Sequence, residues 1–391
     1  MTQPLFRMRL AALRRSLLES PPTLTRALAK PLQPLSASAL SSPLVDSHGR
    51  PHSYLRISLT ERCNLRCTYC MPASGVPLSP PSHLLQLPET LALASHFVSL
   101  GVSKIRLTGG EPTLRADLVA VVEGLGRLRA PSAHHPHTLR TLALTSNGVA
   151  LGQGPLLPAL WASGLDALNL SLDTLQPELF ARLSRRPPAA WASAWRAVPR
   201  ALELGWGATP GRPLKVNTVV QRGVNDGEAA ALVCALTQHL PVTLRFIEFM
   251  PFSGNEWAAQ GTGGVVPSAE LLAGLQAALP ALTPLDSSRS SSSSTEGSGL
   301  WKGHPDWKGS FGFISTVSSA FCASCSRLRL TADGSLRVCL HGEEEVSLRD
   351  VVRGGGDLTE AIARAVQGKH AALGGKPLGQ GLARSMIKIG G

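Results

Sequence analysis

The strongest constraint on the fold is the alternation of short apolar runs with longer helical patterns between residues 54 and 248. Six apolar runs predict strands, at residues 54–59, 105–108, 139–145, 167–171, 214–220 and 244–248. Five segments between them predict helices, at residues 88–100, 116–129, 154–163, 189–204 and 228–239. This alternation indicates an α/β fold built on a parallel sheet or an open barrel.

Polar and glycine-rich motifs follow the predicted strands at their C-terminal ends. A cysteine-rich segment at 62–70 follows the first strand, and Thr-Gly-Gly-Glu-Pro at 108–112 follows the second. Thr-Ser-Asn-Gly at 145–148 follows the third strand and Ser-Leu-Asp at 171–173 the fourth. The C-terminal strand ends of a parallel barrel meet on one face, which carries the active site. The coincidence of four motifs therefore predicts an enzyme.

Composition narrows the class of protein. The chain is 43% hydrophobic and 16% charged and has no apolar run of membrane-spanning length, which is typical of a soluble globular protein. Its 391 residues predict about two or three domains, or one large barrel with additions. The formal charge of +12 favours a polyanionic partner, but residues 1–45 alone hold six basic residues against one glutamate. An aromatic content of 5% disfavours a surface that stacks on nucleic-acid bases.

Residues 1–45 predict an organellar transit peptide. They are rich in Arg, Ser, Leu and Pro, nearly free of acidic residues, and contain no unbroken secretory core. We expect cleavage within roughly residues 35–50 and import into the mitochondrial matrix, in preference to a plastid. The alternative is a disordered or locally helical arm that stays attached.

Two regions follow this arm, a core at 46–265 and a C-terminal region at 266–391. Residues 286–299, with a serine run at 290–294, predict a low-complexity insertion in the second region. Another insertion contains His134, His135 and His137. We expect these histidines to lie in a solvated loop and not in a metal site, because no other candidate ligand adjoins them. We assign no role to either insertion.

The seven cysteines form two triplets and one isolated residue. Their short spacings and odd total favour metal or redox chemistry over disulfides. Cys234 lies in an apolar helical segment, which predicts a core position. The first triplet, Cys63, Cys67 and Cys70, has no obvious fourth ligand nearby for structural zinc. A 4Fe-4S cluster held by three thiolates leaves one iron open to a substrate, so this spacing predicts a reactive cluster.

Residues 62–70, Arg-Cys-Asn-Leu-Arg-Cys-Thr-Tyr-Cys, resemble the motif of the radical S-adenosylmethionine (SAM) superfamily, in which an aromatic residue precedes the third cysteine. Tyr69 occupies that position. The resemblance also implies a glycine-rich stretch after the second strand, which residues 108–112 supply. Glycines there let the backbone approach the amino and carboxylate groups of the methionine moiety.

The second triplet, Cys322, Cys325 and Cys339, predicts another cluster with an open iron; zinc completed by a remote ligand is the alternative. The Arg-Leu-Arg segment at 327–329 would place two guanidinium groups on one side of an extended chain. Guanidinium groups pair bidentately with phosphate oxygens, so the segment predicts a triphosphate. Three cations of the predicted strands can add charge from the other side: Arg56, Arg106 and Lys215.

Taken together, the motifs resemble the GTP 3′,8-cyclase family of molybdenum cofactor synthesis. The resemblance runs from residue 46 to residue 391 and includes both cysteine triplets, a terminal Gly-Gly, and the segments 46–50, 54–58, 71–72, 104–107, 215–217, 222–226 and 245–251. Glu61 stands where the family usually has aspartate, and the serine and histidine segments look like insertions. None of these departures touches a proposed ligand.

The resemblance implies a role for each matched residue. The ligands of the first cluster would be Cys63, Cys67 and Cys70, and those of the second Cys322, Cys325 and Cys339. The SAM contacts would be Tyr69, Gly110, Ser171 and Met250. The GTP contacts would be Arg56, Arg106, Thr145, Lys215, Arg327, Leu328 and Arg329. The implied fold is an incomplete (βα)6 TIM-like barrel, closed by a C-terminal extension that carries the second iron-sulfur cluster.

The implied reaction begins with an electron from a low-potential donor, which cleaves SAM to methionine and a 5′-deoxyadenosyl radical. That radical takes the ribose 3′ hydrogen of GTP, whose guanine sits at the open iron of the second cluster, and the carbon radical attacks C8. The resemblance implies that the radical adduct is then reduced by one electron, with the second cluster as its source. The product, 3′,8-cyclo-7,8-dihydro-GTP, would pass to cyclic pyranopterin monophosphate synthase. The protein would hold the reacting groups and exclude solvent. No nucleic-acid or membrane partner is expected, and a homodimer is kept as an alternative to a monomer.

The terminal Gly390-Gly391 predicts a functional tail, with a frayed end as the alternative. Residues 385–389 are apolar enough to dock, and a dipeptide without side chains is narrow enough to enter a closed barrel. The resembled family ends in the same dipeptide.

Two other functions stay open at this point. One is a radical SAM enzyme with an auxiliary cluster that acts on a peptide, against which the arginines and the Gly-Gly tail argue. The other is a protein without enzymatic activity, either an iron-sulfur electron carrier or a zinc-stabilised nucleic-acid binder, which only the basic charge supports.

Overall fold

The computed structural model describes residues 42–131, 137–250, 264–285, 299–375 and 385–390. Several predicted features fall wholly or mostly outside these residues: the arm at 1–45, the serine-rich insertion, the histidine pair His134-His135, and Gly391. The two cysteine triplets and every other predicted site residue lie within them.

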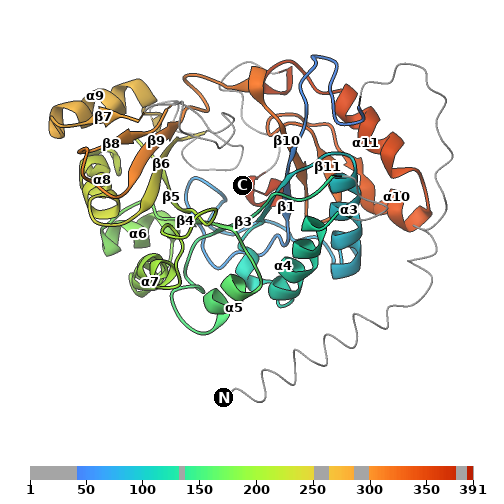
Figure 1. Ribbon diagram of the computed structural model, residues 1–391, viewed down its shortest axis with the longest axis horizontal. Helices are drawn as coiled ribbons and strands as arrows, with labels where there is room; N and C mark the ends of the chain where they lie inside the picture. The colour runs from blue at the N-terminus through green and yellow to red at the C-terminus, as the bar shows by residue number, and fades with distance from the viewer. Residues whose placement is uncertain (1–41, 132–136, 251–263, 286–298, 376–384, 391) are drawn as a thin grey trace.

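The fold is built on one sheet whose central strands are all parallel (Figure 1). The alternating part of the chain supplies β1 (Tyr54–Ser58), β2 (Lys104–Thr108), β3 (Thr141–Ser146), β4 (Ala167–Ser171), β5 (Leu214–Val220) and β6 (Val242–Glu248). These strands lie side by side in chain order, and each pairs in parallel with the next. The six predicted strands and the predicted α/β class are therefore confirmed.

The C-terminal region extends the sheet at both edges. It supplies β7 (Thr283–Pro284), β8 (Trp301–Lys302), β9 (Ser310–Ile314), β10 (Arg327–Leu330), β11 (Ser335–Arg337) and β12 (Val346–Ser347). Strand β10 pairs in parallel with β1, and β9 pairs in parallel with β6. The order is β12-β11-β10-β1-β2-β3-β4-β5-β6-β9-β8-β7, and within the described residues the outermost strands, β12 and β7, do not pair with each other.

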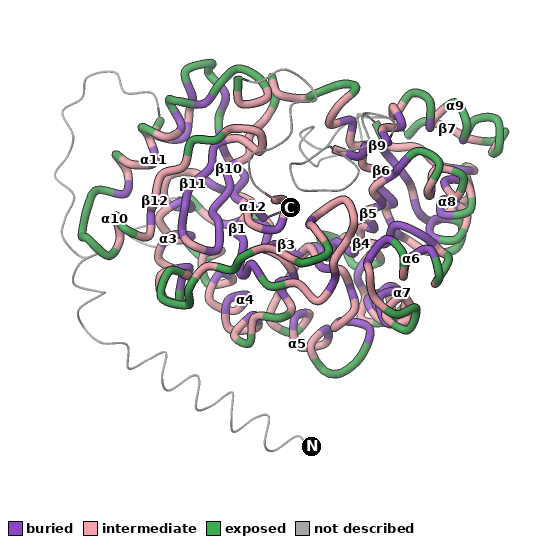
Figure 2. Tube along the Cα trace, turned by 180° about the vertical axis from the view of Figure 1, so that it is seen from behind, coloured by how far each residue is buried: buried purple, intermediate pink, exposed green. Residues whose placement is uncertain are grey.

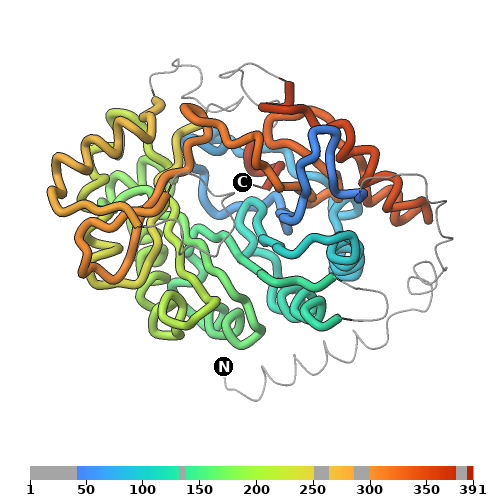
Figure 3. The backbone as a smooth tube through the Cα atoms, turned by 45° about the horizontal axis from the view of Figure 1, so that its top comes forward, coloured from blue at the N-terminus to red at the C-terminus, as the bar shows by residue number. Residues whose placement is uncertain are grey.

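Helices connect the strands and cover the outer side of the sheet (Figures 1 and 3). The α-helices are α3 (Leu87–Ser99), α4 (Leu118–Gly126), α5 (Leu156–Ala162), α6 (Pro177–Ser184), α7 (Ala189–Glu203), α8 (Ala229–Thr237), α9 (Ser268–Ala278), α10 (Leu348–Gly354), α11 (Leu358–Gln367) and α12 (Met386–Ile389). Short 3-10 helices are η1 (Pro81–His83), η2 (Pro112–Leu114), η3 (Arg127–Arg129), η4 (Asp226–Glu228), η8 (Cys322–Ser324) and η9 (Leu373–Gly375). In the described part of the chain, no helix is long and apolar enough to cross a membrane.

All five predicted helices are confirmed, as α3, α4, α5, α7 and α8. Helix α6 was not predicted, although proline at its first position and the buried Leu179, Phe180 and Leu183 mark a short amphipathic helix. Cys234 lies on α8 as expected but is only half-buried, because the fully buried stripe of that helix runs through its neighbours Leu232, Val233 and Leu236.

Alternation along each strand separates a hydrophobic core from a polar inner face. Leu55 and Ile57 of β1 are fully buried in the core, whereas Arg56 between them lines a cavity. Figure 2 shows this concentration of buried residues along the strands. Leu328 has no exposed surface and joins the same core, while Arg327 and Arg329 line the cavity. The side chain of Leu328 therefore packs in the core, and the expectation that Leu328 contacts GTP stays a prediction.

Candidate functional site

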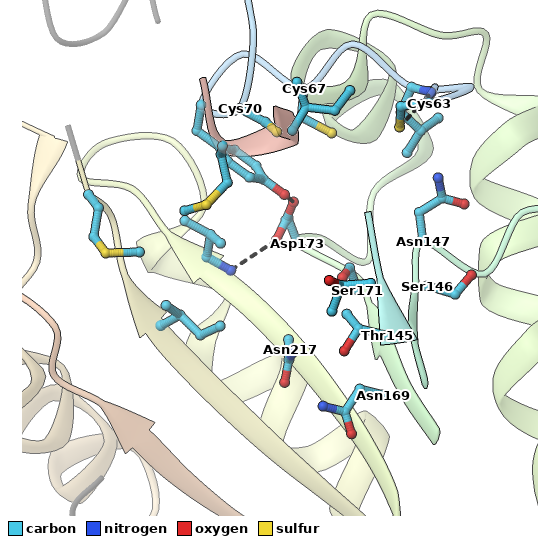
Figure 4. Close-up of a pocket in the computed structure, with 18 of the residues that line it drawn as sticks. Cys63, Cys67, Cys70, Thr145, Ser146, Asn147, Asn169, Ser171, Asp173 and Asn217 are labelled. Atoms are coloured by element: carbon cyan, nitrogen blue, oxygen red, sulfur yellow. Dashed lines mark hydrogen bonds between the residues drawn. The ribbon is translucent and has the colours of Figure 1, made fainter. Parts of the chain in front are cut away.

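A cavity of about 270 Å³ lies at the C-terminal ends of the central strands. Its wall combines the first cysteine triplet, the loops after β2, β3 and β4, inward-facing residues of the strands, and the C-terminal helix α12. Figure 4 shows the cysteines on one side of this space and the side chains of Thr145, Asn169, Ser171 and Asn217 reaching toward it from the strands. Segments far apart in sequence therefore converge on one site.

Most of the predicted contact residues line this cavity. They are Arg56, Cys63, Cys67, Tyr69, Cys70, Arg106, Gly110, Thr145, Ser171, Met250, Arg327 and Arg329. Lys215 is not among the lining residues. Lys215 lies on the same inward-facing side of β5 as Asn217 and Val219, which do line the cavity. It comes before both of them in the strand and therefore lies farther from the C-terminal end, where the cavity is.

The loop that carries the first cysteine triplet is held by arginines. Arg66 donates from Nη1 to the carbonyl oxygens of Cys63 at 2.7 Å and Leu65 at 2.9 Å. Arg186 donates from Nε to the carbonyl oxygen of Asn64 at 2.5 Å, and Arg185 donates to that of Arg66 at 3.1 Å. These contacts fix an irregular backbone whose carbonyl groups would otherwise lack partners.

Burial in the fold opposes ionisation of the three thiols of this loop. Burial raises the pKa of Cys63 and raises the pKa of Cys67 well above its ordinary value. Burial, together with the charges of the nearby Cys63 and Asp173, raises the pKa of Cys70 to about 12. Such thiols stay protonated until a metal takes the place of the proton. Among the described residues, no three His, Cys, Asp or Glu side chains are grouped to hold a single metal ion.

Gly110 allows the loop after β2 to lie against the loop after β1. The Gly110 amide donates to the carbonyl of Thr60 at 2.7 Å, and the Glu111 amide donates to that of Arg62 at 2.7 Å. A Cβ at Gly110 would stand 2.2 Å from the carbonyl oxygen of Arg62. Only glycine therefore permits this approach, which brings the second loop to the cysteine motif.

Glu111 joins three loops around the cavity and was not predicted as a site residue. Its buried carboxylate accepts hydrogen bonds from Ser146 Oγ at 2.7 Å and from the Asn147 amide at 2.7 Å. Asn147 in turn donates from Nδ2 to Asn64 Oδ1 at 2.7 Å. Burial raises the pKa of Glu111, and these hydrogen bonds oppose the rise. The carboxylate therefore positions the loops after β2 and β3 against the cysteine loop.

Tyr69 is oriented by a buried carboxylate. Its hydroxyl donates to Asp173 Oδ2 at 2.8 Å, and the amide of Val219 donates to Asp173 Oδ1 at 2.9 Å. Burial raises the pKa of Asp173 to about 6. The Ser-Leu-Asp motif had indicated polar groups at this edge, but a role for Asp173 depends on a contact across the sheet that sequence spacing does not reveal.

Three arginines form a row across adjacent strands. Arg329 of β10, Arg56 of β1 and Arg106 of β2 are register partners, and all three line the cavity. Arg106 donates to the hydroxyl of Tyr54 and, at 3.2 Å, to Thr145 Oγ1. Burial, and then the charges of Arg56 and Arg327, lower the pKa of Arg329 to about 9. Buried like charges in such a row favour an anionic ligand.

Several residues of the cavity wall carry a buried polar atom with no hydrogen-bond partner in the described residues. Two such atoms are Arg56 Nε, a donor, and Asn169 Oδ1, an acceptor. Buried polar atoms are nearly always hydrogen-bonded, so these two mark places where a ligand can bind. Asn169, Arg245 and Asn217 were not predicted as site residues; Arg245 Nε donates to Asn217 Oδ1 at 3.0 Å. The sequence feature that could have identified them is a polar residue at an inward-facing position of an otherwise apolar strand.

The C-terminal tail enters the site. Arg329 Nη1 donates to the carbonyl oxygen of Gly390 at 2.6 Å, and Ser385 Oγ donates to that of Cys70 at 2.9 Å. Gly390 adopts a φ of +69°, and a Cβ on it would stand 2.8 Å from Thr108 Oγ1. Ile389 is almost fully buried. The tail therefore lies against the cysteine loop, the end of β2 and the arginine row.

The second cysteine triplet lines a smaller pocket of about 80 Å³ that adjoins the main cavity. Cys322, Cys325 and Cys339 all contribute to its wall. Three of the predicted contact residues line both spaces: Met250, Arg327 and Arg329. The arginine side chains thus lie between two groups of three cysteines.

Comparisons with known families divide the chain into two parts. The model of the radical SAM superfamily matches residues 57–233, and the model described as Molybdenum Cofactor Synthesis C matches residues 242–374. The first match contains the first cysteine triplet, and the second contains the other.

Curated relatives agree with these matches. The chain is 44% identical over 356 residues to the mitochondrial GTP 3′,8-cyclase of Arabidopsis thaliana, covering 90% of this chain and 84% of the relative. It is 46% identical over 343 residues to Molybdenum cofactor biosynthesis protein 1 of Bos taurus, covering 86% of this chain and 50% of the relative. The chain thus spans about half the length of several curated relatives it matches.

A solved structure supports the fold. The crystal structure of Streptococcus suis SuiB aligns with a TM-score of 0.50 at 15% sequence identity, covering 87% of this chain and 74% of that one.

The substitution Gly110→Ala should separate the two loops that meet at Gly110. The added methyl group would overlap the carbonyl of Arg62, which we expect to lower the free energy of unfolding by about 1–3 kcal/mol. Hydrogen exchange of the Glu111 amide should also become faster. Gly227→Ala is the matched control, because a Cβ there meets nothing within 4 Å. Equal stability and equal Glu111 exchange in the two variants would show that the close approach is not required.

Proposed function

The chain belongs to the GTP 3′,8-cyclase family of radical SAM proteins, and from that premise we propose that it converts GTP to 3′,8-cyclo-7,8-dihydro-GTP in the first step of molybdenum cofactor biosynthesis. The observation that carries the proposal is the row of Arg329, Arg56 and Arg106 in a cavity that contains the first cysteine triplet and adjoins the pocket of the second. A substrate with a triphosphate would neutralise this row while its base and ribose reach the two sites.

The first cysteine triplet would hold the 4Fe-4S cluster. Cys63, Cys67 and Cys70 supply three thiol ligands on one wall of the cavity, which suits a cluster with one open iron. When bound, this cluster supplies the electron that cleaves SAM and so generates a 5′-deoxyadenosyl radical. Gly110, Ser171, Tyr69 and Met250 line the adjacent wall, as contacts to SAM require.

The second triplet would hold a second 4Fe-4S cluster in the adjoining pocket. Cys322, Cys325 and Cys339 converge there, and Met250 lines both spaces. The open iron would accept the guanine of GTP, so the base would lie beside the boundary between the two spaces. We propose a cluster in preference to zinc at both sites, because a 4Fe-4S cluster can be held by three thiolates with one iron open, whereas structural zinc requires a fourth ligand.

The chain's own residues would orient GTP. Arg56 Nε is a buried donor with no partner in the described residues, so a phosphate oxygen would satisfy it. Arg106 is braced by Tyr54 and Thr145, which fixes its guanidinium beside that of Arg56. Arg327 would add charge at the pocket boundary, and Lys215 would act from deeper along β5. Holding ribose and guanine in one geometry is the main contribution of such a site to the rate.

The C-terminal tail would complete the site. Gly390 accepts a hydrogen bond from Arg329, so the tail fixes one member of the arginine row. We propose that the terminal Gly390-Gly391 helps to position the bound substrate, since a dipeptide without side chains would not obstruct it. We also propose that the sheet is an incomplete (βα)6 barrel at 46–265, closed by strands and helices of 266–391 that carry the second cluster.

The cellular context follows from the same family. We propose that the arm at 1–45 directs import into the mitochondrial matrix, as its composition and the mitochondrial relative suggest. A low-potential electron donor would serve the first cluster, and cyclic pyranopterin monophosphate synthase would consume the product. A homodimer is compatible with this scheme.

Removal of either cysteine triplet should remove half of the iron. The anaerobically isolated protein should contain about eight irons per chain, because each triplet would hold a 4Fe-4S cluster. C63A/C67A/C70A and C322A/C325A/C339A should each retain about four irons. Cys234→Ala is the control, since Cys234 lies on α8 and lines neither pocket, and it should keep the full content. Stoichiometric zinc, or full iron in either triple variant, would contradict the proposal.

Arg56→Ala should weaken GTP binding while leaving both clusters in place. Loss of a charge-assisted hydrogen bond should cost about 1.5–3 kcal/mol of binding free energy, measured by anaerobic calorimetry. Arg56→Lys should restore little, because lysine keeps the charge but loses the planar fork. Arg140→Ala removes the same charge from an exposed position and should bind GTP normally. Unchanged affinity in Arg56→Ala would remove Arg56 from the triphosphate site.

A further inference from the structure

A buried lysine contacts the second cysteine triplet and has no part in the reaction proposed above. Lys369 follows α11 and is only 3% exposed. Its Nζ lies 3.6 Å from Cys325 Sγ, 3.2 Å from the carbonyl oxygen of Arg327 and 2.7 Å from His52 Nε2. Lysine is rarely buried without acceptors for its ammonium group, so the identity of these three partners matters.

The neighbouring histidine is fixed as an acceptor for Lys369. His52 Nδ1 lies 3.0 Å from the carbonyl oxygen of Leu44, which can only accept, so Nδ1 carries the proton. Burial, and then the charge of Lys369, lower the pKa of His52 to about 4, so the ring is neutral at physiological pH. His52 Nε2 therefore accepts from Lys369. An ammonium group has three N–H donors, and the acceptors around Lys369 are His52, Arg327 and Cys325.

The segment after Lys369 is tied to the backbone of the second triplet. Arg50 donates to the carbonyl oxygens of Cys322 at 2.8 Å, His370 at 2.7 Å and Ala371 at 2.7 Å. Arg50 is itself held by Asp46 through an ion pair of 2.6 Å. Lys369 is therefore positioned by the same buried network that positions Cys322.

We propose that Lys369 is a positioning residue that raises the reduction potential of the second cluster through a charged N–H···S contact to Cys325. This inference rests on the proposed function, because it requires a cluster at the second triplet. Reduction adds negative charge to a cluster, and a nearby cation or a hydrogen bond to a ligand sulfur stabilises that charge. A lysine that only fills space would leave the potential unchanged.

The test measures the potential of the second cluster alone. The full chain carrying C63A/C67A/C70A would be titrated anaerobically, with reduction followed by electron paramagnetic resonance. Adding Lys369→Met should lower the midpoint potential by at least the equivalent of a tenfold change in the reduction equilibrium, about 59 mV for one electron. Lys308→Met removes the same charge from an exposed side chain and should not move the potential.

A second measurement keeps the inference testable if Lys369→Met loses its cluster. Protein with Lys369 intact would be labelled with nitrogen-15 lysine, and pulsed resonance should detect one strongly coupled nitrogen at the reduced cluster. An unchanged potential in Lys369→Met at full iron content, or no lysine coupling in the labelled protein, would overturn the role of Lys369. Absence of iron from C63A/C67A/C70A would instead refute the second cluster itself, so the two failures are distinguishable.

Discussion

The placement of three arginines side by side at the centre of a parallel sheet is the constraint on which the site depends. Arg329, Arg56 and Arg106 occupy one register row of β10, β1 and β2, where neighbouring strands lie about 4.8 Å apart. Burial and mutual repulsion already lower the pKa of Arg329 to about 9. The protein offsets part of this repulsion with Tyr54, Thr145 and the carbonyl of Gly390. An anionic substrate would offset the rest when it binds.

The C-terminal region contributes side chains to the site, as the central strands do. It supplies β10 and with it two of the cavity arginines, the second cysteine triplet, and the tail that joins Arg329 to the cysteine loop. Glu111 plays the matching part within the core, because its carboxylate holds the loops after β2 and β3 beside Asn64. Both regions must therefore be in place before the pocket of the second triplet adjoins the cavity of the first.

Sequence patterns predicted the strands and the lining residues where the signal is local. Arg56 and Arg106 were named as cations of predicted strands and from the family resemblance, and the structure places them on the side of the strand opposite to the buried Leu55 and Ile105. The cysteine spacing singled out both triplets. Leu328 was carried over with its neighbours as one motif, and alternation turns its side chain to the core. Glu111, Asp173 and Lys369 were missed because their roles depend on contacts between distant segments.

The central claim is that the two triplets and the arginine row act together on GTP. The most direct test supplies the anaerobic, iron-replete protein with a reductant, SAM and GTP deuterated at ribose C3′, and follows both products by mass spectrometry. Our account predicts 3′,8-cyclo-7,8-dihydro-GTP together with 5′-deoxyadenosine that carries the deuterium. Cleavage of SAM without deuterium transfer, or with no cyclised nucleotide, in protein that retains both clusters would contradict it.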